Sequence, residues 1–259
     1  MVKAPMTRTL ITGASSGIGR TLSIRLARDR HALALVARRE SELQEVAGLC
    51  RDAGAPDVRI YPTDVSDPAA AQRTVQQAEA ALGGLDLVIA NAGIAINASV
   101  HKMSWEDFER LTRVNYLGAV ATFLAALPGM VERKSGHLVG VASIAGFRGL
   151  PKFSAYSASK AALIAFLEGA RVDLRSRGVD VTIVSPGYVA TPMTAPNRFK
   201  MPFLVDVDRA ADLIATGIAS KRRHIAFPFP MVTAMRLART LPMWLYDRVV
   251  GQGTKKFPS

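Results

Sequence analysis

Near the N-terminus the chain reads Thr9-Leu10-Ile11-Thr12-Gly13-Ala14-Ser15-Ser16-Gly17-Ile18-Gly19, and this stretch decides the predicted fold. Its first three residues have the apolar, β-branched character of a short buried strand. A glycine-rich turn follows, and residues 20–28 then have the apolar spacing of a helix. Such a turn lets the backbone approach a pyrophosphate, which then sits at the positive end of the helix. Glycine spacing alone would also suit a plain tight turn. The prediction of a phosphate-binding turn therefore depends on the strand before it and the helix after it.

Further apolar runs of strand length follow at regular intervals, at residues 31–37, 58–62, 85–90, 137–142, 181–185 and 224–228. Segments with helical spacing lie between them, among them 41–52, 68–82 and 105–126. Short connections between alternating strands and helices are typical of an α/β fold. We expect a Rossmann-like doubly wound parallel sheet of about seven strands with helices on both faces. Ligands of such sheets bind beyond the carboxyl ends of the strands.

Two arginines, Arg38 and Arg39, follow the second apolar run. In dinucleotide-binding folds this strand end meets the adenosine ribose, where an acidic residue about 20 positions past the glycines binds the 2′-hydroxyl of NAD. In this sequence Arg38 stands at the position of that acidic residue, and its positive charge would bind a 2′-phosphate. The sequence therefore favours NADP over NAD, against the alternative that the arginines simply end a strand.

A second stretch, Phe153-Ser154-Ala155-Tyr156-Ser157-Ala158-Ser159-Lys160, places a phenol and an ammonium four residues apart. On a helix these two side chains lie one turn apart on the same face. A free tyrosine has a pKa near 10, and lowering it by roughly 3 units requires about 4 kcal/mol of phenolate stabilisation. One positive charge about 4 Å away, at an effective dielectric of about 20, supplies that order of energy. Tyr156 is a candidate general acid/base tuned by Lys160, although an ordinary helix surface would show the same spacing.

Composition limits the class of protein. The chain has 259 residues, 49% of them hydrophobic and 21% charged, which is typical of one large soluble domain spanning residues 1–259. Its single cysteine, Cys50, is expected to pack in the core, and the lack of an intrachain disulfide suits a reducing cytoplasm. The start of the chain is too short and polar for a signal peptide, and no apolar run reaches the length of a spanning helix.

Several short motifs occur in a fixed order along the chain: TGASSGIG at residues 12–19, Asn91-Ala92-Gly93, Asn115, Ser143, Tyr156 with Lys160, and Pro186-Gly187 followed by Thr191. In order and spacing this set resembles the short-chain dehydrogenase/reductase family, of the non-extended, NADP-preferring type. The resemblance covers roughly residues 7–228. It implies a Rossmann-fold oxidoreductase that moves hydride between a nicotinamide cofactor and a carbonyl or alcohol.

The resemblance implies four catalytic residues. Tyr156 would give a proton to the carbonyl oxygen during reduction, and Lys160 would lower its pKa and bind the nicotinamide ribose. Ser143 would bind the substrate oxygen. Asn115 would position a water that links Lys160 to solvent.

The expected cofactor is NADP(H), and no metal site is expected. The predicted cofactor-binding residues are Gly13, Ser15, Ser16, Gly17, Ile18, Gly19, Arg38, Arg39, Asp64, Val65, Asn91, Ala92, Gly93, Tyr156, Lys160, Pro186, Gly187, Val189 and Thr191.

An irregular, proline-containing segment at residues 188–205 is expected to form a substrate lid. Its apolar side chains include Met193, Phe199, Met201 and Phe203. Residues between Ser143 and Tyr156 should form the opposite wall. We expect the substrate to be a hydrophobic ketone or aldehyde, against the alternative that these side chains only pack the lid shut. The predicted substrate-binding residues are Ile144, Phe147, Phe153, Tyr188 and Met193.

A basic amphipathic extension occupies residues 229–259, in a chain of net charge +12. We expect it to pack across the pocket or against another subunit, and the alternative is peripheral contact with an anionic membrane. The resemblance implies a homodimer formed by the helices that carry Asn115 and Tyr156, with a tetramer as the alternative.

The leading prediction is an NADPH-dependent carbonyl reductase. Its alternatives are an alcohol dehydrogenase working oxidatively and a cofactor-binding scaffold docked through its tail. Nucleic-acid binding is not expected, because the basic residues lack aromatic stacking partners.

Overall fold

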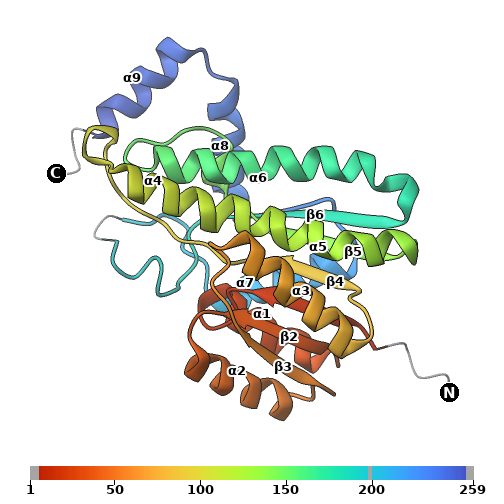
Figure 1. Ribbon diagram of the computed structural model, residues 1–259. Coiled ribbons are helices and arrows are strands. Elements are labelled where there is room, and N and C mark those ends of the chain that lie inside the picture. The colour runs from red at the N-terminus through yellow and green to blue at the C-terminus, as the bar shows by residue number, and fades with distance from the viewer. Residues whose placement is uncertain (1–5, 198–199, 255–259) are drawn as a thin grey trace.

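A seven-stranded parallel sheet forms the centre of the computed structural model, which describes residues 6–197 and 200–254 (Figure 1). Every neighbouring pair of strands is parallel, in the order β3-β2-β1-β4-β5-β6-β7. The expected doubly wound sheet is confirmed. The chain reverses its direction of winding between β1 and β4, and ligands of open parallel sheets bind at such a point. The strands are β1 Arg8–Thr12, β2 Ala32–Ala37, β3 Val58–Pro62, β4 Leu87–Ala90, β5 Gly136–Val141, β6 Val179–Pro186 and β7 His224–Phe227.

Helices cover both faces of the sheet. On one face lie α1 Gly17–Arg28, α2 Glu40–Asp52 and α7 Val207–Ala219. On the other lie α3 Pro68–Leu82, α4 Trp105–Thr112, α5 Gly118–Glu132 and α6 Ser154–Asp173. Each face has its own cluster of buried apolar side chains, which explains why a strand such as β2 is apolar along its whole length. Cys50 packs in the first of these faces as expected, and burial raises the pKa of its thiol to about 12.

Local sequence accounts for several helix starts. Pro68 stands in the first turn of α3, and the Asp67 carboxylate accepts hydrogen bonds from the backbone N–H groups of Ala69 and Ala70. The Ser104 hydroxyl caps α4 by accepting from the Asp107 N–H at 3.1 Å. Short helices complete the connections: η1 Val100–Lys102, the π-helical turn η2 Arg113–Leu117, η3 Ile144–Gly146 and η4 Arg175–Arg177.

One continuous helical segment, Trp105–Glu132, is long and apolar enough to cross a membrane by length and composition alone. In the fold it comprises α4, η2 and α5, and it packs between α3 and α6. Its side chains Phe123 and Met130 are fully buried in the core. We therefore interpret it as a core helix of the α/β domain.

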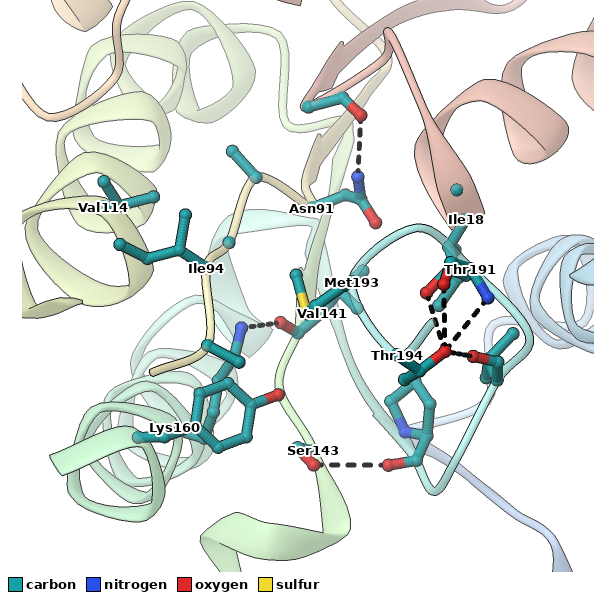
Figure 2. A pocket seen from close by; sticks show the side chains of 18 of the residues that line it. Ile18, Asn91, Ile94, Val114, Val141, Ser143, Lys160, Thr191, Met193 and Thr194 are labelled. Atoms are coloured by element: carbon teal, nitrogen blue, oxygen red, sulfur yellow. Dashed lines mark hydrogen bonds between the residues drawn. The ribbon is translucent and has the colours of Figure 1, made fainter. Parts of the chain in front are cut away.

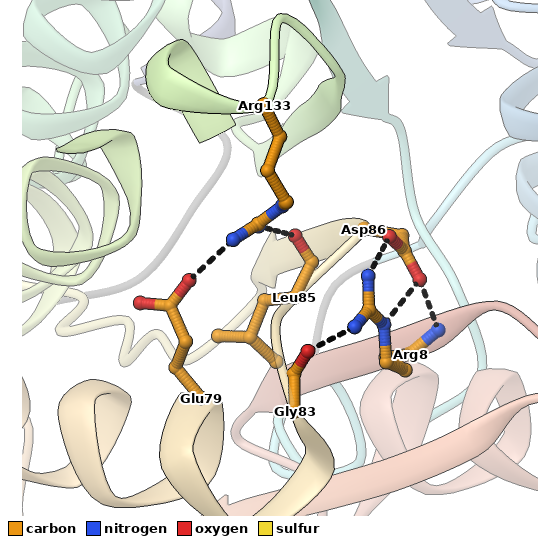
Figure 3. Close-up of polar contacts among 6 residues, drawn as sticks. All are labelled: Arg8, Glu79, Gly83, Leu85, Asp86 and Arg133. Carbon is orange, nitrogen blue, oxygen red and sulfur yellow. Dashed lines mark hydrogen bonds and ion pairs between the residues drawn. The ribbon is translucent and has the colours of Figure 1, made fainter. Parts of the chain in front are cut away.

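Ion pairs join elements at the amino end of the sheet (Figure 3). The Arg8 guanidinium donates to both carboxylate oxygens of Asp86, at 2.8 and 2.6 Å, and to the Gly83 carbonyl. Arg133 donates to the Glu79 carboxylate at 3.2 Å and to the Leu85 carbonyl at 3.0 Å. These contacts join β1 to the segment that leads into β4, and they connect α3 with α5. The opposite, carboxyl end of the sheet is where the predicted site residues gather.

Beyond β7 the chain forms two further helices, α8 Phe229–Thr240 and α9 Met243–Thr254. Figure 1 shows them standing away from the sheet, beside the start of α6. They correspond to the described part of the predicted extension.

Candidate active site

The glycine-rich turn between β1 and α1 is held by β4. Gly13 and Gly17 have left-handed backbones, with φ of +68° and +52°, which glycine adopts without strain. A Cβ on Gly19 would lie only 2.2 Å from the Gly13 carbonyl oxygen, so the turn closes on itself without room for a side chain. The Asn91 side chain donates to the carbonyls of Thr12 and Gly13 at 3.0 and 3.2 Å. These contacts place the backbone of the turn at the carboxyl ends of the two central strands.

A cavity of about 500 Å³ opens at this edge of the sheet, within the range of known ligand sites. It runs from the turn before α1 past the ends of β4 and β5 to α6. Most of the predicted site residues line it: Gly13, Ser15, Ser16, Gly17, Ile18, Arg38, Arg39, Asp64, Val65, Asn91, Ala92, Gly93, Ser143, Ile144, Phe153, Tyr156, Lys160, Pro186, Gly187, Tyr188, Val189, Thr191 and Met193.

Three predicted residues do not line the cavity. Gly19 lies behind the turn, and Asn115 is fully buried behind the wall. The prediction for Phe147 is wrong. Its ring is buried and meets the His224 imidazole edge-on, with centroids 5.8 Å apart. The reason is that η3 is pressed onto α6, where a Cβ on Gly146 would lie 2.9 Å from the Lys160 backbone, and the next side chain is directed to β7 instead.

Ser143, Tyr156 and Lys160 line the α6 end of the cavity. Figure 2 shows Ser143 and Lys160 there. Ser143 follows β5, and its hydroxyl accepts from the Ala145 N–H at 3.1 Å and lies 3.4 Å from the Pro186 carbonyl oxygen, to which it donates. Tyr156 and Lys160 stand one turn apart on α6, as expected. The Lys160 ammonium donates to the Val141 carbonyl at 2.8 Å and lies 5.9 Å from the centre of the Tyr156 ring.

The pKa shifts of this group differ from the expected pattern. Burial raises the pKa of Tyr156, and a hydrogen bond with Ser143 acts in the opposite direction. Burial lowers the pKa of Lys160 to about 8. Contrary to the expectation, Lys160 is not among the groups that shift the Tyr156 pKa in this arrangement. The cause is geometric, because the ammonium is directed at the Val141 carbonyl and its own charge is disfavoured by the same burial.

Asn115 lies in the π-helical turn η2, where the regular α-helical hydrogen-bond pattern is interrupted. Its amide accepts from the Ile94 N–H at 2.8 Å and donates to the Ile94 carbonyl at 3.0 Å. It also donates to the Ser159 hydroxyl at 3.1 Å. A Cβ on Gly93 would lie 3.3 Å from both the Asn115 Oδ1 and the Lys160 Nζ. Asn115 therefore fixes the segment after β4 against α6, and its oxygen faces the same small space as the Lys160 ammonium.

Two guanidinium groups stand at the other end of the cavity. Arg38 follows β2 and lies 3.8 Å from the Asp64 carboxylate, with 66% of its side chain exposed. Arg39 donates to the Ser15 hydroxyl at 3.4 Å and pairs with Glu42 at 3.0 Å. Both cations border the glycine-rich turn and remain open to solvent.

The irregular segment after β6 contributes several lining residues to the cavity: Tyr188, Val189, Thr191, Pro192, Met193, Thr194 and Asn197. A backbone bridge between Val189 and Val205 closes its base. Inside it, the Thr194 hydroxyl donates to the Val189 carbonyl at 2.6 Å. A Cβ on Gly17 would lie 3.3 Å from Thr191, so the segment and the glycine-rich turn touch. Phe199, one of the predicted apolar side chains, lies outside the described residues.

Sequence reasoning did not place some of the lining residues. Ile94 and Val114 line the cavity between β4 and η2, and Met231 and Met235 reach it from α8. The two methionines stand four residues apart, which marks a common helix face, yet nothing in that spacing says what the face meets. Ile94 directly follows Asn91-Ala92-Gly93, and its position beside this motif was an available signal.

Comparison with known proteins agrees with this geometry. The model of the short chain dehydrogenase family matches residues 7–201. The chain belongs to the short-chain dehydrogenase/reductase family. It is an oxidoreductase of the kind that acts on CH–OH or C=O groups, and the family uses NAD(P)(H).

Relatives and solved structures of this family cover most of the chain. An uncharacterized oxidoreductase of Myxococcus xanthus is 44% identical over 240 residues, covering 92% of this chain and 94% of the relative. A fatty acyl-CoA reductase of Acinetobacter baylyi is 38% identical, covering 84% and 74%. The ketoacyl reductase HetN of Nostoc is 34% identical, covering 83% and 76%. An alcohol dehydrogenase from Thermococcus sibiricus, complexed with 5-hydroxy-NADP, matches with a TM-score of 0.79 at 27% identity, covering 86% and 96%.

The residues present fit a nicotinamide dinucleotide of this family. The turn from Gly13 to Gly19 exposes backbone at the start of α1, where a pyrophosphate is stabilised by the helix N-terminus. The cavity continues from there to Tyr156 and Lys160 at one end and to Arg38 at the other. It therefore has the extent and the polar groups that a long, doubly phosphorylated ligand requires.

Proposed function

We propose that this protein is an NADPH-dependent reductase of a hydrophobic ketone or aldehyde. The observation that carries the proposal is the layout of one cavity. Ser143, Tyr156 and Lys160 stand at one end, Arg38 and Arg39 at the other, and the glycine-rich turn between them. Past the catalytic group the wall is largely apolar, formed by Ile144, Leu150, Phe153, Tyr188, Met193, Met231 and Met235.

The preference for NADPH rests on the two arginines. Arg38 and Arg39 place positive charge beside the end of β2, where a dinucleotide's adenosine ribose lies in this fold. A 2′-phosphate gains charge-assisted hydrogen bonds from guanidinium groups, and a 2′-hydroxyl gains less. The Thermococcus sibiricus relative, which was solved with 5-hydroxy-NADP, supports the same choice.

In the proposed mechanism a bound NADPH supplies the hydride. The Ser143 hydroxyl binds the substrate carbonyl oxygen and holds it beside Tyr156. Tyr156 donates its proton to that oxygen as negative charge develops, which typically accelerates such a step by about 10²–10⁴-fold. Lys160 would hold the nicotinamide ribose of the bound cofactor, and its positive charge would favour the phenolate that remains. Asn115 Oδ1 and the Lys160 ammonium face one space, where a water would pass a proton from solvent to Lys160.

The hydrophobic substrate class is supported by the relatives as well as by the wall. Two relatives carry the names fatty acyl-CoA reductase and ketoacyl reductase. Their names describe reductions of acyl compounds, which suit an apolar cavity. The methionines of α8 add flexible, polarisable side chains that adapt to an alkyl chain.

The decisive experiment is an NADPH-oxidation screen over ketones and aldehydes graded by size and polarity. We expect turnover to increase with apolar bulk. Tyr156→Phe should lower kcat by at least about 10²-fold with little loss of NADPH binding, because the ring stays and only the proton donor is removed. Turnover of only small charged ketones would contradict the proposed hydrophobic substrate class. Undiminished turnover by Tyr156→Phe would contradict the assignment of Tyr156 as the proton donor.

The same groups run in reverse during alcohol oxidation, with Tyr156 accepting the proton. The alcohol dehydrogenase among the structural relatives favours testing this direction as well. NADP⁺ reduction with the matching alcohols measures it. The close grouping of Ser143, Tyr156 and Lys160 argues against a cofactor-binding scaffold without activity.

A further inference from the structure

The helix α8 has two different apolar faces. Met231 and Met235 reach the cavity, and Val232 between them is buried. Phe229 and Leu237 lie on the opposite face of the helix, with 80% and 62% of their surface exposed. The inner face accounts for the packing that the sequence predicted. The outer face has no partner within the part of the chain that the structure describes.

Helix α9 continues this exposed apolar character. Met243 and Trp244 in its first turn are 77% and 67% exposed, and Val249 is 59% exposed. We call Phe229, Leu237, Met243, Trp244 and Val249 together the α8–α9 surface. Exposed large apolar side chains gathered on one unit of a soluble protein mark an interaction site.

Charge around the α8–α9 surface has one dominant sign. Arg236, Arg239 and Arg248 are exposed on the same two helices, and Asp247 is the acidic residue among them. The sequence adds Lys255 and Lys256 directly after α9. A basic surface of this kind repels a second copy of itself and attracts an anionic surface.

The surface is held in place against the catalytic loop. The Arg148 guanidinium donates to the carbonyls of Ala238, Arg239 and Leu241 at the end of α8, at 2.8, 3.0 and 2.9 Å. It also lies 4.1 Å from the centre of the Tyr246 ring on α9, and the Tyr246 hydroxyl donates to the Gly149 carbonyl. Both helices are thereby fastened to the loop between Ser143 and Tyr156.

We propose that the α8–α9 surface docks the protein on an anionic lipid membrane. Aromatic and apolar side chains flanked by arginines match the boundary between lipid headgroups and acyl chains. Trp244 inserts at that boundary, and Arg236, Arg239 and Arg248 contact the phosphates. The docked helix α8 then has its outer face on the membrane and its inner face on the cavity. This docking does not depend on which carbonyl the protein reduces.

The chain's tryptophans give a direct test. Trp105 and Trp244 are its two tryptophans, so Trp105→Phe leaves Trp244 as the reporter on the surface. Vesicles of equal parts phosphatidylglycerol and phosphatidylcholine should shift its emission to shorter wavelength and sediment with the protein. Vesicles of phosphatidylcholine alone should do neither, and raised salt should weaken the binding. An unshifted emission with anionic vesicles at low salt would overturn the proposal.

A second experiment separates the surface from overall charge. Arg236→Glu with Arg239→Glu should weaken sedimentation with anionic vesicles at least tenfold. The matched control reverses two exposed arginines on other elements, Arg59→Glu on β3 with Arg73→Glu on α3, and should leave binding nearly unchanged. If both pairs of substitutions weakened vesicle binding equally, the net charge of the protein alone would account for the binding. A Trp244→Ser chain that loses self-association but keeps vesicle binding would assign the surface to a second copy instead.

Discussion

Lys160 is a buried amine whose ammonium donates to a backbone carbonyl, and burial lowers its pKa to about 8. In the unfolded chain a lysine titrates near 10.4. Between these two values the unfolded state binds more protons than the folded state, so stability rises with pH across this window. The cost of burying the charged amine is full below pH 8 and is relieved above it. Burial of the charged Lys160 amine thus opposes folding at neutral pH.

We predict that the free energy of unfolding of the wild type, relative to Lys160→Met, rises between about pH 8 and 10 by on the order of 2–3 kcal/mol. Urea unfolding at a series of pH values and one protein concentration measures the difference. The methionine variant fills a similar volume and lacks the titrating group, so it serves as the reference. A difference that stays flat across this window would show that Lys160 titrates normally.

Arg38 and Arg39 should set the choice between NADPH and NADH. Replacing both with alanine removes charge-assisted contacts that are worth about 1.5–3 kcal/mol each when made to an ionised partner. We expect the Kd for NADPH to rise at least tenfold and that for NADH to change little. Fluorescence titration of the two cofactors measures both. Arg59→Ala, also paired and exposed, is the control. Equal losses for both cofactors would contradict a role at the 2′-phosphate.

Among the secondary-structure elements, helix α8 lines the cavity, packs on the core through Val232 and is hydrogen-bonded to the loop after β5. Arg148 satisfies three carbonyls near the C-terminus of α8, a place where orphan acceptors and a cation suit one another. Met231 and Met235 line the cavity from the same helix. This end of the cavity is therefore built by residues far apart in the chain.

We predict that Arg148→Ala raises the KM for a bulky hydrophobic carbonyl several-fold and changes kcat for a small one little. Loss of the three hydrogen bonds should also speed limited proteolysis within α8 and α9. Steady-state kinetics with two substrates and a proteolysis time course measure the two effects. Arg177→Ala, on the exposed turn η4, is the matched control. An unchanged KM for the bulky substrate, together with unchanged proteolysis, would exclude the attachment.

At the scale of the whole molecule, α5 and α6 lie side by side along one face of the sheet (Figure 1). Phe123 and Phe166 stack between them with centroids 6.5 Å apart. On their outer side, Leu117, Leu124 and Val172 are 40%, 49% and 67% exposed. We propose that this apolar side forms the homodimer, as the resemblance to the family implied.

We predict that Leu124→Glu converts the dimer to a monomer, because the new carboxylate would meet its symmetry mate in an isologous interface. Size-exclusion chromatography with light scattering measures the mass. Val249→Glu, on the α8–α9 surface, should leave the mass unchanged. A wild-type monomer would contradict the proposed dimer, and dissociation by Val249→Glu but not by Leu124→Glu would place the interface elsewhere.

The amino-acid sequence by itself determined the sheet, the glycine-rich turn and the catalytic motif. These depend on local patterns, namely apolar runs of strand length, glycines at a turn and residues one helical turn apart. It also located Ser143, Asn91 and Arg38 at strand ends, because parallel strands end at one edge.

Only the tertiary structure decided which side chains face the cavity. In the fold, Phe147 packs in the core, Met231 and Met235 reach the cavity wall from α8, and the Lys160 ammonium donates to the Val141 carbonyl. The physical reason is that burial and direction depend on how elements pack across the sheet. The identity of the neighbouring residues in the sequence does not show which elements pack against one another.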